Sequence, residues 1–167
     1  RSPTVTGVQT CALPILLFAL LVSAAFGSFF SRRLLAGHPG RWPWIFLALV
    51  AYGGAFLAFC QPLFAHLLQY ALPWRWIAAT VLIFPLGFFM GMPFPLGIAA
   101  LDRCYPAGIA WAWGMNGFFT VLGGFLSLVS AFFLGFRMTL LIALGIYCVA
   151  LLAYAMISKA RAGLARA

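Results

Sequence analysis

Long uninterrupted apolar stretches constrain this sequence more than any other feature. A helix that crosses the hydrocarbon core of a bilayer needs about 20 predominantly apolar residues. Five stretches within residues 16–157 meet or approach that length, the first being the shortest. The sequence therefore predicts an all-α fold, a polytopic transmembrane helical bundle of about five spans, at residues 16–30, 43–64, 74–101, 107–135 and 138–157.

The composition excludes a soluble globular domain and a nucleic-acid binder. Hydrophobic residues make up 66% of the chain and charged residues only 7%, whereas soluble domains carry about 25% charged residues. The net charge is +9, but the basic residues are scattered between apolar stretches and form no stripe that would bind DNA or RNA. We therefore expect the lipid bilayer to be the main partner of this chain.

The basic residues also predict how the helices are oriented. In a five-helix topology seven of them fall on one side of the membrane and two on the other. Cytoplasmic loops carry the excess of Lys and Arg, so we expect the tail at 158–167 to be cytoplasmic and the first helix to begin outside. The seven are Arg32, Arg33, Arg41, Arg103, Lys159, Arg161 and Arg166, and the two are Arg75 and Arg137.

The first fifteen residues differ in character from the rest of the chain. The stretch VTGVQTCALPI, 5–15, is polar and rich in turn formers, and it resembles an in-frame translation of a common short-read sequencing adapter. An extracellular cap and a signal-peptide end are the alternatives, although the charged region and the small-residue cleavage pattern of a signal peptide are missing. We expect residues 1–15 to be an assembly artefact, and an upstream part of the natural chain to precede Leu16 and act as a partner of these helices.

The third predicted helix is irregular. Its FPLGFFMGMPFPLG stretch holds three prolines, each of which removes a backbone donor and clashes with the preceding turn. Non-helical backbone at membrane depth is tolerated only where protein or a wet cavity covers it. Two interpretations remain open: a kinked packing helix, or a broken helix that lines a substrate site as in some transporters. The residues concerned are Pro85, Gly87, Gly91, Pro93, Pro95 and Gly97.

The fourth predicted helix carries a face of small and polar residues at intervals of three or four. Such a face allows two backbones to approach closely in lipid, and we expect it to pack on Gly87 and Gly91 of the third helix. Asn116 is then either a donor in an interhelical hydrogen bond or a polar contact in a substrate path. The face comprises Gly108, Ala112, Asn116, Thr120, Gly124, Ser127, Ala131 and Gly135.

The sequence lacks the residues that most enzyme chemistry needs. Asp102 is the only acidic residue, so paired carboxylates for acid–base catalysis and a carboxylate-bound metal site are excluded. We expect Asp102 and Arg103 to form a local ion pair in a loop, His38 and His66 to lie near the membrane interface, and no metal, cofactor or catalytic residue to belong to this chain. Apart from Arg75 at the very start of 74–101, no charged residue lies inside a predicted span, which argues against ion-coupled transport.

Three motifs resemble those of a known family. GSFFSRR, PLGFFMGMPFPLG and WAWGMNGFFTVLGG resemble the multi-pass membrane region of bacterial spermidine-synthase-like proteins, over nearly all of 16–157. The resemblance implies helices like half of a major-facilitator-type bundle, in a bacterial inner membrane, accompanied by a soluble aminopropyltransferase-like domain of Rossmann type. That domain's glycine-rich loop and acidic residues are not in this chain, so no catalytic or cofactor residue carries over.

Three hypotheses therefore stand. The chain is the membrane module of a spermidine-synthase-like protein whose chemistry belongs to a cytosolic domain, a fragment of a secondary transporter of major-facilitator-like type, or a structural anchor. The helix motifs favour the first hypothesis. The irregular third helix and the polar face of the fourth favour the second hypothesis. The absence of charged residues from the membrane interior of the predicted spans weakens it.

Overall fold

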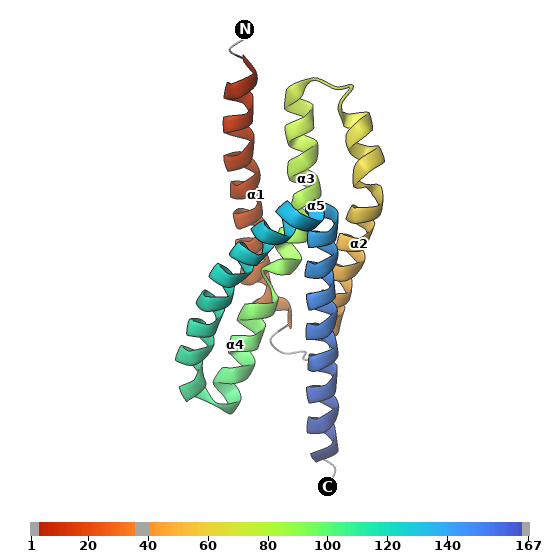
Figure 1. Ribbon diagram of the computed structural model, residues 1–167. Helices are drawn as coiled ribbons and strands as arrows, with labels where there is room; N and C mark the ends of the chain where they lie inside the picture. Colours follow the sequence, from red (N-terminus) through yellow and green to blue (C-terminus); the bar gives the residue numbers. More distant parts are fainter. Residues whose placement is uncertain (1–3, 36–40, 165–167) are drawn as a thin grey trace.

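A computed structural model describes the backbone of residues 4–35 and 41–164, and the side chains of 14–33, 41–103 and 105–156. Within these ranges the regular structure is entirely helical, which confirms the all-α prediction. The elements are α1 (Thr4–Leu35), α2 (Trp42–Leu67), α3 (Leu72–Met90), α4 (Pro93–Cys104), the short 3₁₀ turn η2 (Pro106–Gly108) and α5 (Ile109–Leu164). Figure 1 shows them as long rods that run up and down beside one another.

In the part of the chain that the structure describes, four helical segments are long and apolar enough to cross a membrane. Hydrophobic side chains dominate each of them, and a continuous helix satisfies its own backbone groups where water is absent. The described part of the chain therefore has the features of a multi-pass membrane protein. The four segments are Pro14–Arg33, Trp42–Leu67, Leu72–Arg103 and Pro106–Met156.

The last of these segments contains a sharp reversal. Gly135 has φ 82° and ψ 161°, and it is the one residue inside α5 whose backbone angles are not helical. This backbone region is open essentially to glycine alone. Figure 1 shows α5 as two arms that meet at an apex and diverge from it. The reversal lies at the boundary between the predicted segments 107–135 and 138–157.

The predicted irregularity of the third helix is present as an interruption between α3 and α4. Helix α3 ends at Met90, and α4 begins at Pro93, with Gly91 and Met92 between them. Pro93 and Pro95 cannot donate the backbone hydrogen bonds that would continue the helix. Pro85, by contrast, lies within α3 without ending it.

The closest helix pair is α1 with α3 rather than the predicted pair. A Cβ on Gly87 would overlap the hydroxyl of Ser23, and a Cβ on Gly91 would overlap the backbone carbonyl of Ala24. From the other side, a Cβ on Gly27 would overlap the carbonyl of Phe88. The prediction that Gly87 and Gly91 pack on residues 107–135 is therefore wrong, because α1 lies directly against both glycines.

The small face of the fourth predicted helix is largely exposed. On this face, nothing lies within 4 Å of the position that a Cβ on Gly124 would take. The side chains of Asn116, Thr120 and Ser127 on the same arm of α5 are exposed as well. This arm contacts α4 near its start, where the rings of Phe94 and Trp113 meet edge to face at 4.9 Å between centroids.

The remaining helices close the bundle around a small interior. Leu49 and Gly53 of α2 are buried, and Leu144 of the second α5 arm lies directly over Gly53. The Tyr52 hydroxyl donates a 2.7 Å hydrogen bond to the carbonyl of Leu82 and so links α2 to α3. Most large hydrophobic side chains elsewhere are exposed, as expected where lipid is as apolar as the side chains themselves.

Arg75 stabilises the connection between α2 and α3. Its Nε donates to the carbonyl of Tyr70 at 3.0 Å, and its Nη2 donates to the carbonyl of Leu68. Both acceptors follow the last turn of α2, whose carbonyls have no partner within the helix. A guanidinium at a helix C-terminus also offsets the negative end of the helix dipole.

Candidate functional site

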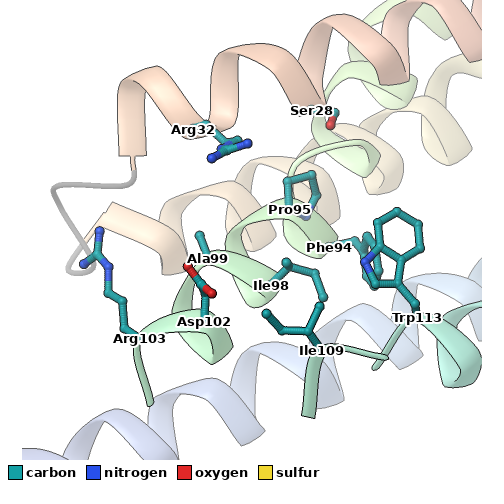
Figure 2. A pocket seen from close by; sticks show the side chains of 10 residues that line it. All are labelled: Ser28, Arg32, Phe94, Pro95, Ile98, Ala99, Asp102, Arg103, Ile109 and Trp113. Carbon is teal, nitrogen blue, oxygen red and sulfur yellow. The ribbon is translucent and has the colours of Figure 1, made fainter. Parts of the chain in front are cut away.

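A pocket of about 590 Å³ opens between α1, α4 and the start of α5. All three sequence motifs contribute to it: GSFFSRR supplies one wall, PLGFFMGMPFPLG a second, and WAWGMNGFFTVLGG the third. Figure 2 shows the lining side chains projecting from the facing helices. They are Ser28, Arg32, Phe94, Pro95, Ile98, Ala99, Asp102, Arg103, Ile109 and Trp113.

The α1 wall presents one turn of the helix to the pocket. Ser28 and Arg32 are four residues apart, so they lie on the same helix face. Figure 2 shows Arg32 extending from α1 toward α4. Its neighbour Arg33 takes another direction, with its guanidinium carbon 4.6 Å from the centre of the Phe29 ring. Arg33 therefore packs on an aromatic ring, whereas Arg32 faces the pocket.

The α4 wall carries the only carboxylate in the chain. Pro95, Ile98, Ala99 and Asp102 recur at intervals of three or four and form one face of α4. Figure 2 shows Asp102 across the pocket from Arg32. Arg103 lines the same pocket at its edge, with its side chain directed away from that of Asp102.

The third wall begins at a tight turn. The 3₁₀ turn η2 joins α4 to α5. Gly108 in this turn is buried, and a ring carbon of Tyr105 lies 2.6 Å from the position that a Cβ on Gly108 would take. This turn directs the first arm of α5 back along α4, so that Trp113 reaches Phe94. The two rings form the apolar end of the pocket.

The predicted site residues divide into three groups. Gly87 and Gly91 lie at the α1–α3 contact, and Pro93 and Pro95 open α4, with Pro95 in the pocket wall. The second group, on α5, lies neither at the α1–α3 contact nor in the pocket lining; it comprises Asn116, Thr120, Gly124 and Ser127. Thr120 donates to the carbonyl of Asn116 at 2.7 Å and Ser127 to that of Gly124 at 2.9 Å, so both hydroxyls bond within their own helix.

The third group, Asp102 and Arg103, does line the pocket. Adjacent residues on a helix do not face each other, and Figure 2 shows their side chains diverging. The geometry therefore does not favour the predicted ion pair between them. It sets Asp102 instead on the wall opposite Arg32.

Two sets of residues were not predicted from the sequence. Ser23, Gly27 and Ser31 are buried on α1, four residues apart, and form the small face that receives α3. Their S-x-x-x-G-x-x-x-S spacing was a usable signal. Ser28, Arg32 and Trp113 of the pocket were assigned only to spans and loops, and the four-residue spacing of Ser28 and Arg32 was the available clue.

The pocket has the groups for binding rather than for covalent chemistry. It offers one hydroxyl, one carboxylate and two guanidinium groups among apolar side chains. Among the described residues no group of three or more His, Cys, Asp or Glu side chains is placed to hold a metal ion. His66 lies in the last turn of α2, outside the pocket, and His38 falls outside the described residues.

The fold and this site define a class, a multi-pass α-helical membrane protein with a charged pocket between helix ends. Comparison with known protein families, with curated proteins and with solved structures finds no match for the chain.

Proposed function

We propose that the chain is the membrane-embedded module of a spermidine-synthase-like protein, with five spans, a cytoplasmic C-terminus and its chemistry in a soluble domain outside this chain. The observation that carries the proposal is the convergence of three motifs. The segments that resemble the family, 27–33, 85–97 and 111–124, are separate in sequence, yet each supplies a wall of one pocket.

Gly135 supports the number of spans. A helix of 30 Å length needs only about 20 residues, and Pro106–Met156 has 51. With a reversal at Gly135, each arm of α5 is long enough to cross the bilayer by itself. The module then crosses five times, and its C-terminus emerges on the side where α1 and α4 end.

The charges support the orientation. Arg32 and Arg33 end α1, Arg41 precedes α2, and Arg103 lies in the last turn of α4. Loops with an excess of Lys and Arg stay in the cytoplasm. Of the two basic residues assigned to the other side, Arg75 caps the end of α2, so local structure accounts for its presence there.

Resequencing the locus with independent chemistry tests this proposal. We expect the reads to lack the codons for 5–15 and to continue the open reading frame upstream of Leu16 into a soluble domain with a strand, a glycine-rich loop and a helix. Retention of VTGVQTCALPI would refute the artefact hypothesis. Further apolar spans with no soluble domain would refute the spermidine-synthase-like assignment.

A fragment of a secondary transporter of major-facilitator-like type is the second candidate. The interruption at Gly91 and Met92 favours it, because broken helices commonly form substrate sites in transporters. The close contact of this interruption with α1 favours a packing role instead, since Ala24 fills the space beside Gly91. The same resequencing separates the two candidates.

A further inference from the structure

We propose that the pocket between α1, α4 and α5 binds the headgroup of a zwitterionic phospholipid with a primary ammonium group, as in phosphatidylethanolamine. This inference rests on the membrane setting of the helices and not on the family proposed above. It gives the pocket a ligand with one phosphate and one ammonium group, a few bonds apart.

The position of the pocket matches the level of lipid headgroups. Arg32 is one residue from the end of the apolar segment Pro14–Arg33, and Asp102 is one residue from the end of Leu72–Arg103. Ile109 lies close to the start of the third contributing segment, Pro106–Met156. Three helix ends thus meet at the boundary between hydrocarbon and water. Trp113, 57% exposed, is of the residue type enriched at that boundary.

The charges of the pocket fit a phosphate beside an ammonium group. A guanidinium binds phosphate through charge-assisted hydrogen bonds, and Arg32 extends into the space with Arg103 at its edge. An ammonium donates well to a carboxylate, and Asp102 faces Arg32 across the pocket. The two arginines outnumber the single carboxylate, which disfavours a polyamine or another ligand that carries only positive charge.

The apolar walls favour a membrane lipid over a soluble molecule with the same headgroup. Phe94, Pro95, Ile98 and Ile109 line the pocket beside its charged groups. The surface of the first α5 arm beyond Trp113 carries exposed apolar side chains such as Val121 and Leu128. Acyl chains can lie along this surface while the headgroup stays at the level of Arg32.

Native mass spectrometry of the full 167-residue chain tests the proposal. The purified protein would be offered phosphatidylethanolamine, phosphatidylglycerol and phosphatidylcholine with identical acyl chains. We expect phosphatidylethanolamine to be retained about tenfold more strongly than the other two. Asp102→Asn should lower this preference to about the level of phosphatidylcholine, and Arg32→Gln should weaken all three about tenfold.

Arg137→Gln is the matched control, because it removes a basic residue outside the pocket, and it should leave the preference unchanged. The preference is the ratio of phosphatidylethanolamine retained to the other lipids retained by the same variant. A change in overall stability alters the retention of all three lipids together, so it does not produce the change in ratio expected for Asp102→Asn. Equal retention of the three lipids, or an unchanged ratio in Asp102→Asn, would overturn the proposal. Displacement of the lipid by soluble phosphoethanolamine at equal concentration would show that the ligand is a soluble molecule and would also overturn it.

Discussion

Single atoms at three glycines determine how close α1 and α3 lie. Gly27, Gly87 and Gly91 each face a backbone or side-chain atom where even a methyl group has no room. Lipid offers no hydrophobic driving force between helices, so close packing and hydrogen bonds must hold the pair together. The buried hydroxyl of Ser23 donates a hydrogen bond to the carbonyl of Leu20 at 2.8 Å. The polar group at this contact is therefore satisfied within α1.

Gly91→Ala should destabilise the bundle by about 1–3 kcal/mol, the usual cost of adding a carbon to a packed contact. The new methyl group would overlap the backbone carbonyl of Ala24, which cannot move without shifting α1. The measurement is the unfolding midpoint in mixed detergent micelles. Gly117→Ala, in open space on α5, is the control and should leave the midpoint unchanged or raise it. Equal effects of the two variants would contradict the α1–α3 packing.

Tyr52→Phe should cost about 1 kcal/mol, because it removes the hydrogen bond to Leu82 that joins α2 to α3. The same unfolding assay measures this loss. Tyr147→Phe serves as the comparison, since the structure gives no hydrogen bond to that hydroxyl among the side chains it describes. If the unfolding midpoint falls as much in Tyr147→Phe as in Tyr52→Phe, the hydrogen bond from Tyr52 to Leu82 contributes nothing to stability.

At the scale of elements, α5 depends on a single reversal. Thr139 donates to the carbonyl of Gly135 at 3.1 Å, so the second arm begins with a side-chain hydrogen bond to the turn. A straight α5 would leave its second half without contact to α2. With the reversal, Leu144 reaches Gly53, and Tyr154 stacks on Trp42 with 5.6 Å between ring centroids.

Gly135→Ala should strain this turn by about 1–3 kcal/mol, since an L side chain is disfavoured at these angles. A disulfide between cysteines introduced at Gly53 and Leu144 would report whether the second arm still reaches α2. We expect this crosslink to form in the parent and to weaken in the Gly135→Ala background. Gly145→Ala, at a helical position in open space, should not change it. Full crosslinking in both backgrounds would show that the turn does not depend on glycine.

The elements were predictable from the sequence to different degrees. The apolar stretches predicted helical segments because length and hydrophobicity suffice for that, and Pro93 and Pro95 marked the interruption before α4. The helix partners were not predictable in the same way. Two small faces, one on α1 and one on 107–135, offered Gly87 and Gly91 equivalent surfaces, and only the three-dimensional course of the chain decides between them. The pocket was missed for a related reason, because Arg32 is far from Asp102 and Trp113 in sequence.

At the scale of the whole molecule, the helix ends define two distinct sides. The ends of α1 and α4 and the start of α2 share the side that carries the pocket, whereas the connection at 68–71 lies at the opposite end of α2 and α3, as Figure 1 shows. The pocket therefore belongs to the basic side, where the positive-inside rule predicts cytoplasm. Any soluble domain attached to this module on that side would lie next to the pocket.

The most direct test of the five-span account is the sidedness of the C-terminus relative to residues 68–71. A dual reporter, with fluorescent-protein and alkaline-phosphatase activities, would be fused after Ala167 in one protein and inserted after Gln69 in another. If each arm of α5 crosses the bilayer, the two positions lie on opposite sides, with the C-terminus cytoplasmic and Gln69 outside. If α5 crosses only once, both positions lie on the same side, and that result would contradict the account.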